Sequence, residues 1–441
     1  SASKIASLIS SYEIDYYLKD LFNLNRSLAG ENNRKTLKYL KNIVPLSIKG
    51  IKSDTNIEGW TIPKEWTINK GHISIDGEKI LDFKDNNLHV PSYSQSVNKL
   101  LSFKELLKKI HTHKIPKAIP YRTFYYKKDW GFCLSKENLN LLKNNLKNQK
   151  NKKIKVRIDA KFKKGKMNYG EILIPGRSKR EILISTYICH PSMANDNLSG
   201  VILTSLLARF LFSKANLKWS YRLVFVPETI GAISYISKNK KIFNNINTGF
   251  NISCVGGKGM FSVKQSVDKD HYINDLVIEV LKKNKIKFKL FPFDINGSDE
   301  RQYSYFGNKL NIISLHKDKY YDFKEYHTSL DNLNFVNGSQ VFATFNLYRL
   351  ILNKLENEDV YVSSNKFCEP MLSKFKLYPN IGGAINPILN QNKNLDNILW
   401  VLFYSNGIRT LSQIKKKINI SESKLNKIIK KLKIEGLLQN V

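Results

Sequence analysis

The feature that most constrains the fold of this chain is a regular alternation of strand-like and helix-like segments between residues 182 and 356. Apolar runs of strand length lie at 182–189, 221–227, 247–255 and 311–316, and segments with the pattern of helices lie at 198–213, 231–243, 271–285 and 337–356. Strands that alternate with helices of about 10–15 residues are typical of a mainly parallel sheet with helices on both faces. We therefore predict an α/β domain with a mainly parallel or mixed sheet.

Polar residues follow these strands at the points where they end. His190 closes the first strand, and Asp196 lies in the loop that leads into the next helix. Glu228 comes directly after the second strand, and His327 comes after the fourth. In open α/β sheets, ligands bind outside the carboxyl ends of the strands. We expect the four side chains to lie at one site.

This set of residue types is suited to a metal ion. Zinc takes imidazole and carboxylate ligands, and a catalytic zinc site uses about three protein ligands with one position open. His190, Asp196 and His327 fit that description, and Glu228 is then an unligated carboxylate able to take a proton from an activated water. Spacing alone leaves ordinary roles open, because Asp and Glu also cap helices and most histidines are structural.

The rest of the chain divides into segments of different character. We predict a main domain from residues 1–50 and 118–390, an inserted β-rich module at 51–117 and a winged-helix module at 391–441. The inserted module carries a hairpin signal at Asp76-Gly77 and a helix, SFKELLKKIHTH, near its end. A lysine-rich hairpin is expected at 154–174, with its turn at Gly165-Lys166.

The C-terminal segment has the spacing of three short helices. Ser421 is expected to cap the third of them, and Gly436 to end it. That helix is basic, with lysines at positions 424, 427, 430, 431 and 433, and one interpretation makes it a DNA-recognition helix. We favour a packing module instead, because lysine is abundant along the whole chain and its net charge of +35 is not confined to this segment.

Bulk composition limits the class of protein. A hydrophobic content of 42% over 441 residues predicts a globular chain with a substantial core. No apolar run is long enough for a membrane helix, and the acidic residues near the N-terminus do not fit a secretory signal. Four cysteines without paired spacing favour reduced thiols. We expect a cytoplasmic protein without membrane insertion; its oligomeric state stays open.

Several motifs together resemble a known family. The stretches CHPSMANDNLSG, PETIGA, GSDERQY and YHTSLDNL are similar to the domain of the di-zinc aminopeptidases of peptidase family M28. More closely, with WTIPKEW, ILDFKDNNLHVPSYS and IPYRTFYYKKDWGFCLS, they resemble a bacterial group of zinc-peptidase-like proteins. Members of that group combine this domain with an inserted β-rich module and a C-terminal winged helix, and they are often labelled as associated with polysaccharide biosynthesis. The resemblance covers nearly the whole chain.

The resemblance implies a role for each residue of the site. His190 and His327 match metal-binding histidines, Asp196 matches the aspartate that bridges two zinc ions, and Glu228 matches the catalytic glutamate. Two positions depart from the pattern. Thr229 stands where the family has a zinc-binding glutamate, and Ser253 stands where it has an aspartate. Because hydroxyls are poor zinc ligands beside imidazole and carboxylate, we predict one zinc ion per chain.

The implied activity is hydrolysis of an amide or peptide bond, with water activated by the metal and by Glu228, on a peptide or a small molecule. Asp299 or Glu300 is expected to hold a substrate amine and Arg301 a carboxylate. Tyr326 or Tyr303 is expected to donate a hydrogen bond to the developing oxyanion. An alternative is a catalytically weakened scaffold that binds a metal or senses a ligand, with the winged helix as its interaction or DNA-binding module.

Overall fold

The structure is a computed structural model that describes residues 9–149, 151–378, 383 and 393–441. The chain forms two compact units. The first comprises the residues up to Val267 and Lys285–Arg349, and the second comprises Asp268–Asn284 and Leu350–Val441. Each unit has buried apolar clusters of its own.

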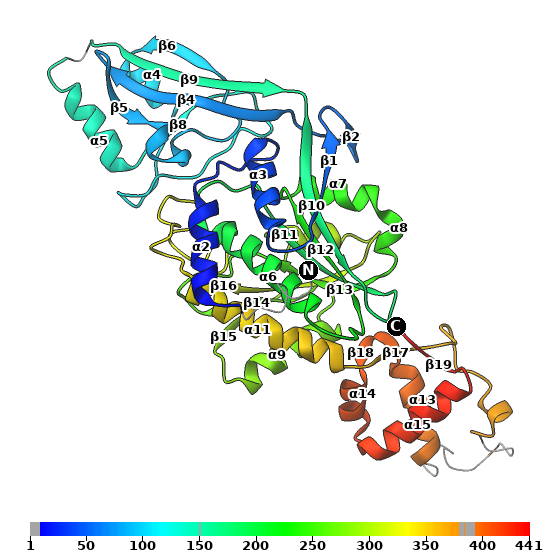
Figure 1. Cartoon of the computed structure of the whole chain (residues 1–441). Helices are drawn as coiled ribbons and strands as arrows, with labels where there is room; N and C mark the ends of the chain where they lie inside the picture. The colour runs from blue at the N-terminus through cyan, green and yellow to red at the C-terminus, as the bar shows by residue number, and fades with distance from the viewer. Residues whose placement is uncertain (1–8, 150, 379–382, 384–392) are drawn as a thin grey trace. The chain divides into compact units, whose positions relative to one another are not determined.

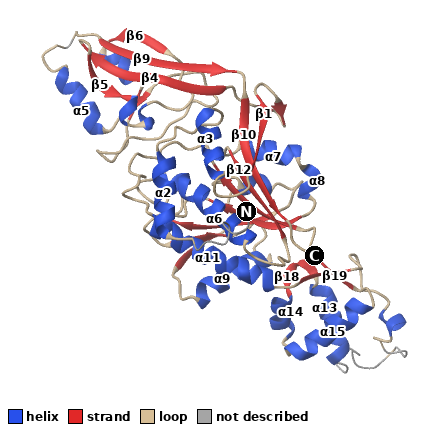
Figure 2. Ribbon diagram, in the orientation of Figure 1, coloured by secondary structure: helices blue, strands red, loops and turns tan. Residues whose placement is uncertain are grey.

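The first unit is built around a mixed eight-stranded sheet (Figures 1 and 2). In spatial order its strands are β1 (Ser47–Lys52), β10 (Lys166–Ile174), β12 (Ser220–Val226), β11 (Glu181–Tyr187), β13 (Ile246–Ile252), β16 (Asn311–Lys317), β14 (Phe261–Lys264) and β15 (Phe288–Phe291). The central strands β12, β11, β13 and β16 are parallel, and the pairs β1–β10, β10–β12 and β14–β16 are antiparallel. The predicted α/β fold with a mainly parallel or mixed sheet is confirmed.

Helices cover both faces of this sheet. Those of the first unit are α2 (Ser11–Phe22), α3 (Glu31–Leu40), α6 (Gly200–Phe212), α7 (Ile230–Lys238), α8 (Lys240–Phe243), α10 (Glu300–Tyr303) and most of α11 (Gly338–Asn357). On one face, Phe250 of β13 packs against Tyr348 of α11. On the other face, Leu183 of β11 and Val224 of β12 share a buried cluster with Tyr235 of α7. Apolar residues on both sides of the central strands are the reason why those strands read as continuous apolar runs.

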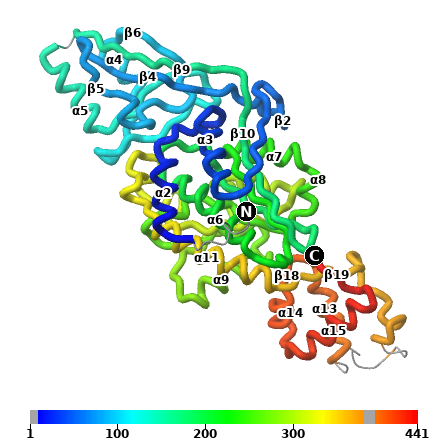
Figure 3. Tube along the Cα trace, in the orientation of Figure 1, coloured from blue at the N-terminus to red at the C-terminus, as the bar shows by residue number. Residues whose placement is uncertain are grey.

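A β-rich module is inserted between two neighbouring strands of the large sheet. The chain leaves the sheet after β1 and returns to it as β10 (Figure 3). Between them a four-stranded sheet has the order β5 (Glu78–Asp82), β4 (Glu65–Ile75), β9 (Ile154–Lys163), β6 (Val97–Leu101). Smaller elements complete it: β2 (Asn56–Ile57), β3 (Trp60–Thr61), the 3-10 turns Phe83–Asp85 and Asn87–His89, α4 (Phe103–Leu107), β7 (Ile110–His111), β8 (Phe132–Cys133) and α5 (Lys136–Asn145). The predicted turn at Asp76-Gly77 joins β4 to β5.

Two local predictions about this region are wrong. Residues 154–174 do not form a hairpin: β9 pairs with β4 and β6, whereas β10 pairs with β1 and β12 in the large sheet. The segment SFKELLKKIHTH is helical only to Leu107, since its last residues pair as β7 with β8. The inserted sheet also takes in β9, beyond the predicted end of the module at residue 117. Long-range strand pairing decided all three points.

The second unit contains a winged-helix arrangement. Its elements are α9 (Tyr272–Lys283), β17 (Val360–Ser363), the 3-10 turn Leu372–Phe375, α13 (Lys393–Tyr404), β18 (Asn406–Thr410), α14 (Leu411–Ile418), α15 (Glu422–Ile434) and β19 (Leu438–Asn440). The antiparallel sheet has the order β18-β17-β19. As predicted, the Ser421 side chain caps α15 by accepting from the N–H of Lys424, and Gly436 follows the helix with φ 72°. Residues 379–382 and 384–392, at the predicted start of this module, lie outside the described part of the chain.

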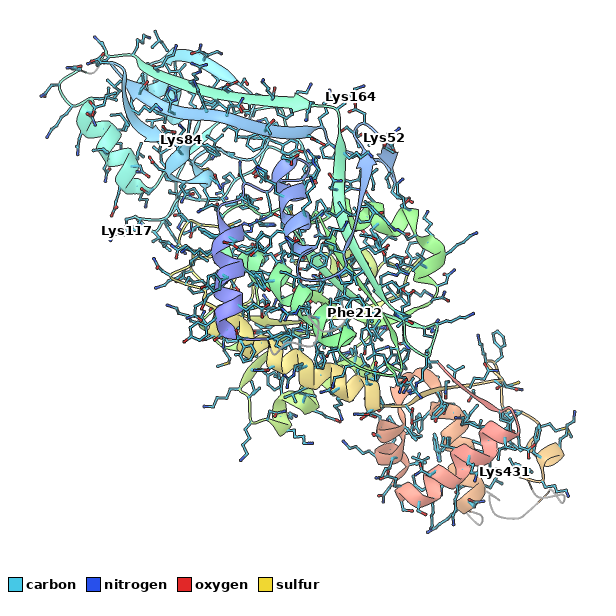
Figure 4. All side chains as sticks on the ribbon, viewed as in Figure 1. Lys52, Lys84, Lys117, Lys164, Phe212 and Lys431 are labelled. Atoms are coloured by element: carbon cyan, nitrogen blue, oxygen red, sulfur yellow. The ribbon has the colours of Figure 1, made fainter. Side chains whose placement is uncertain are left out.

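The positive charge is distributed over many elements. Figure 4 labels exposed lysines on β1 (Lys52), on a 3-10 turn (Lys84), before β8 (Lys117), between β9 and β10 (Lys164) and on α15 (Lys431). The four cysteines, all at described positions, are free. Within the described ranges, none of the helices has the length and apolar character needed to cross a membrane.

Candidate metal centre

Parallel strands carry the predicted site residues to one edge of the large sheet. β11 is buried along its whole length, and the chain then passes His190 and enters an irregular turn, Ala194–Ser199, that leads into α6. Asp196 lies in this turn. Glu228 follows β12, the strand beside β11. His327 lies in the loop after β16, which is joined to β11 through β13.

Three of these side chains meet. One ligand atom from each of His190, Asp196 and His327 lies within 4.8 Å of the others. Oδ2 of Asp196 is 2.9 Å from Nε2 of His327 and 3.7 Å from Nε2 of His190. His190 and Asp196 are buried, whereas 32% of the His327 side chain is exposed. The group is therefore open to solvent on the His327 side.

Asp331 fastens the two loops that carry this group. Its Oδ1 accepts a hydrogen bond from the N–H of Asn195 at 2.6 Å, and its Oδ2 accepts one from the N–H of Asp196 at 2.9 Å. Its backbone carbonyl accepts a third from the N–H of Ala194 at 2.9 Å. Because Asp331 belongs to the same loop as His327, these bonds fix the two loops relative to each other.

Aromatic side chains surround the three residues. The hydroxyl of Tyr187 donates to Oδ1 of Asp196, the oxygen that does not face the histidines. The ring of Tyr121 packs against both imidazoles, with centroid distances of 5.3 Å to His190 and 5.1 Å to His327. These contacts restrict the rotation of each side chain, as outer partners of a metal ligand do.

The electrostatics keep the two buried members in the protonation states that bind metals. Burial lowers the pKa of His190 to about 4, so its imidazole is neutral near pH 7. Burial by itself raises the pKa of Asp196, but the nearby His190 and His327 hold that pKa well below its ordinary value. A neutral imidazole and an ionised carboxylate are the forms that coordinate zinc.

Glu228 stands beside this group without being part of it. Its Oε2 accepts a hydrogen bond from the hydroxyl of Ser298 at 2.8 Å, and its N–H lies 3.3 Å from Sγ of Cys189. Burial, followed by repulsion from Asp299 and Asp196, raises the pKa of Glu228 well above its usual range. A carboxyl group with a raised pKa holds a proton more tightly than an ordinary glutamate.

The three residues predicted to contact substrate have different surroundings. Glu300 is buried and forms an ion pair with buried Lys264 at 2.8 Å, so the chain itself satisfies its charge. Arg301 is half-buried and donates to a backbone carbonyl of its own loop at 3.1 Å. Asp299 is 1% exposed, and one of its oxygens accepts from the N–H of Thr229 at 2.7 Å.

The two candidate tyrosines also differ. The ring of Tyr326 stacks on the imidazole of His327, with a centroid distance of 3.8 Å. Tyr303 is fully buried, and its hydroxyl lies 2.7 Å from the hydroxyl of Ser185. Only Tyr326 is therefore in contact with the group of three residues.

Thr229 and Ser253, the two positions at which this chain departs from the family pattern, offer no carboxylate to a metal ion. Thr229 begins the turn into α7 with φ 66°, a costly conformation for a β-branched residue, and its N–H is held by Asp299. Ser253 follows β13, and its buried hydroxyl has no hydrogen-bond partner in the described part of the chain.

Sequence reasoning missed Tyr187, Ser298 and Asp331. Each lies inside or beside a motif from which the site was predicted: Tyr187 is three residues before His190, Ser298 is in GSDERQY and Asp331 is in YHTSLDNL. The motifs therefore indicated the segments in which these residues lie, but only the folded chain shows which hydroxyl or carboxyl group faces which loop.

Comparison with known proteins agrees with this architecture. The model of the family described as "Domain of unknown function (DUF4910)" matches residues 16–358, and a winged helix-turn-helix model matches 359–440. A Clostridium acetobutylicum protein named "Putative polysaccharide biosynthesis protein with aminopeptidase-like domain" is 39% identical over 406 residues, which are 91% of this chain and 90% of that protein.

Solved structures show the same fold. A "putative peptidase" from Clostridium acetobutylicum has a TM-score of 0.77 at 36% identity and covers 98% of this chain and 96% of its own. A zinc aminopeptidase from Bacillus subtilis has a TM-score of 0.55 at 13% identity, covering 80% of this chain and 95% of its own. The chain therefore belongs to the family of the domain of unknown function DUF4910, joined here to a winged helix-turn-helix, and its large domain has the fold of the zinc aminopeptidases.

Proposed function

We propose that this protein is a hydrolase of amide or peptide bonds that uses one zinc ion, held by His190, Asp196 and His327, with Glu228 as general base. One observation carries the proposal. Three potential ligand atoms lie within 4.8 Å of one another, and Glu228, whose N–H contacts Cys189 beside His190 and whose charge is repelled by Asp196, is not one of them. The aminopeptidase-like domain named in the Clostridium acetobutylicum relative supports the same reaction class.

The residues present fit a single zinc ion. Two imidazoles and one carboxylate are a ligand set that zinc accepts, with a further position left for water or substrate. Only Oδ2 of Asp196 faces the histidines, since Oδ1 is bonded by Tyr187. The carboxylate is thus arranged to serve one ion. When bound, zinc would supply Lewis acidity towards a carbonyl group and towards water.

Glu228 is proposed to move the proton. In its ionised form, a carboxylate with a raised pKa is a stronger base than an ordinary glutamate; Glu228 then accepts a proton from the attacking water and later gives it to the leaving amine. Ser298 holds one of its oxygens and so orients the other. Tyr326, stacked on His327, is the proposed donor to the oxygen on which negative charge develops.

A binding scaffold without catalysis is the alternative. It has no use for an unligated carboxyl group beside a metal, and the half-buried position of Glu228 between Ser298 and Cys189 is a costly one for an acid without a role. The proposed hydrolase explains this residue, whereas the scaffold does not.

The test separates metal binding from catalysis. We expect about one zinc ion per chain in protein purified without added metal, measured by elemental analysis. Glu228→Gln should keep that zinc and lose at least about 100-fold in rate on a mixture of L-amino acid amides, read by mass spectrometry. The exposed Glu137→Gln, on α5, is the matched control and should change neither value. A Glu228→Gln variant that retains both zinc and full activity would exclude the mechanism.

A further inference from the structure

Arg26 carries a buried positive charge close to the candidate metal centre. The residue lies between α2 and α3 and is 1% exposed. Burial lowers the pKa of Arg26 to about 10, so the guanidinium is still protonated near pH 7. In the described ranges its hydrogen bonds go only to neutral oxygens, and its Nη2 has no partner there. A buried cation without a carboxylate is costly, and an apolar side chain of similar volume would fill the same space without that cost.

The guanidinium joins three segments of the chain. Its Nε donates to the carbonyl of His190 at 3.1 Å, and its Nη1 donates to the carbonyl of Leu21, in the last turn of α2, at 2.7 Å. Nη1 also donates to Oγ1 of Thr36, on α3, at 3.4 Å. The pairing of β11 with β12 ends at Tyr187, before His190 is reached. The bond from Arg26 therefore holds the backbone of a metal-binding residue at a point to which the strand pairing does not extend.

The backbone at Arg26 is fixed in turn by α3. The N–H of the next residue, Ser27, donates to Oδ1 of Asn33 at 3.0 Å, and Nδ2 of Asn33 donates to the carbonyl of Ser27 at 2.6 Å. Both residues are buried, and Asn33 belongs to α3. A guanidinium is a planar group with its donors in a rigid fork. Arg26 therefore fixes the His190 segment relative to two helices.

A second arginine near Arg26 in the sequence has the surroundings of a purely structural residue. Arg34, on α3, is half-buried, and its Nη2 donates to Oε2 of Glu65 at 2.9 Å. In the described ranges the other hydrogen bonds of its side chain go to Glu31, Asn168 and the second oxygen of Glu65. The charge of Arg34 is compensated by carboxylates. Arg26 differs in both respects, because its charge has no carboxylate partner and one of its bonds goes to a metal-binding residue.

We propose that Arg26 is a positioning residue of the metal centre, which holds the backbone of His190 so that its imidazole stays beside Asp196 and His327. The part of this inference that concerns zinc rests on the proposed function. The restraint on residues 188–196 does not, and it is measurable in protein without a metal.

The first experiment measures this restraint in zinc-free, full-length protein. Hydrogen exchange of peptides that cover residues 188–196 is followed by mass spectrometry, with peptides from β13 as the internal reference. We expect Arg26→Met to exchange at least about 10-fold faster in residues 188–196 and at an unchanged rate in β13. In the matched control, Arg34→Met, exchange in the two regions should keep its ratio. An unchanged ratio in Arg26→Met overturns the proposal.

Arg26→Met is a suitable variant because it leaves only neutral oxygens behind. Its free energy of unfolding should therefore stay close to that of the unmodified protein, whereas Arg34→Met strands Glu65 and should be less stable. Arg26→Lys keeps the charge but lacks the fork of donors, and it provides the same exchange test should Arg26→Met not fold.

The second experiment measures zinc affinity by competition with a chelating dye. Arg26→Met should bind zinc about 10- to 100-fold more weakly than the unmodified protein, the usual effect of losing an outer partner of a ligand. Arg34→Met should keep the affinity in spite of its lower stability. Equal loss in the two variants, or no loss in Arg26→Met, overturns the positioning role. If the unmodified protein binds no zinc, the proposed function fails, and hydrogen exchange alone decides the role of Arg26.

Discussion

Tyr187 donates its phenolic hydrogen to Oδ1 of Asp196, while Oδ2 of the same carboxylate faces the two histidines. The two oxygens of Asp196 therefore have different partners. Tyr187 comes from the end of β11 and Asp196 from the turn that follows, so one short segment supplies both groups. The phenol orients the carboxylate, and the carboxylate presents one oxygen to a cation.

Tyr187→Phe should weaken zinc binding. Without the phenol, Oδ1 loses its donor and the carboxylate is free to rotate; loss of such an outer partner typically lowers metal affinity about 10- to 100-fold. Competition with a chelating dye measures the change. Tyr303→Phe is the control, since its hydroxyl contacts Ser185 and not a ligand. Equal affinities of Tyr187→Phe and the unmodified protein would show that the phenol does not position Asp196.

Ser298→Ala should shift the pH dependence of hydrolysis. The hydroxyl of Ser298 stabilises the ionised form of Glu228 and lowers its pKa, so its removal raises that pKa further. Since the base must be ionised to act, the acid limb of the rate profile should move to higher pH. Ser298→Thr keeps the hydroxyl and should leave the limb in place. A profile of kcat against pH decides it; movement to lower pH in Ser298→Ala contradicts the role of this bond.

Lys264→Met should destabilise the protein rather than alter substrate binding. It leaves the buried carboxylate of Glu300 without its ion-pair partner, which typically costs about 3–5 kcal/mol. Urea unfolding measures the loss. Lys79→Met breaks a partly exposed pair with Asp82 and should cost about 1 kcal/mol or less. A raised KM with an unchanged free energy of unfolding in Lys264→Met would make Glu300 a candidate substrate ligand again.

Much of the candidate site was predictable, for a reason rooted in sheet geometry. Parallel strands end at the same edge, so His190, Glu228 and His327, each placed after a predicted strand, were expected to converge. Asp196 followed from its place between a strand and a helix. The convergence of the two histidines with Asp196 within 4.8 Å agrees with that expectation.

Other features depended on contacts that a linear pattern does not contain. The alternation of apolar and charged residues over 154–174 predicts two strands, but it does not determine which strands they pair with. In the structure the two strands belong to different sheets. In the same way, Glu300 and Asp299 were equivalent candidates for a substrate amine. Lys264, which lies 36 residues from Glu300 in the chain, forms an ion pair with Glu300.

The sequence by itself determined the alternation of elements, the mixed α/β sheet, the winged helix and the set of residues at the strand ends, because periodicity and turn residues act locally. The tertiary structure alone decided which carboxylates are engaged: Oδ1 of Asp196 by Tyr187, Glu300 by Lys264, and Asp331 by the turn that carries Asp196. Hydrogen bonds and burial depend on distances between segments remote in sequence, and those distances exist only in the folded chain.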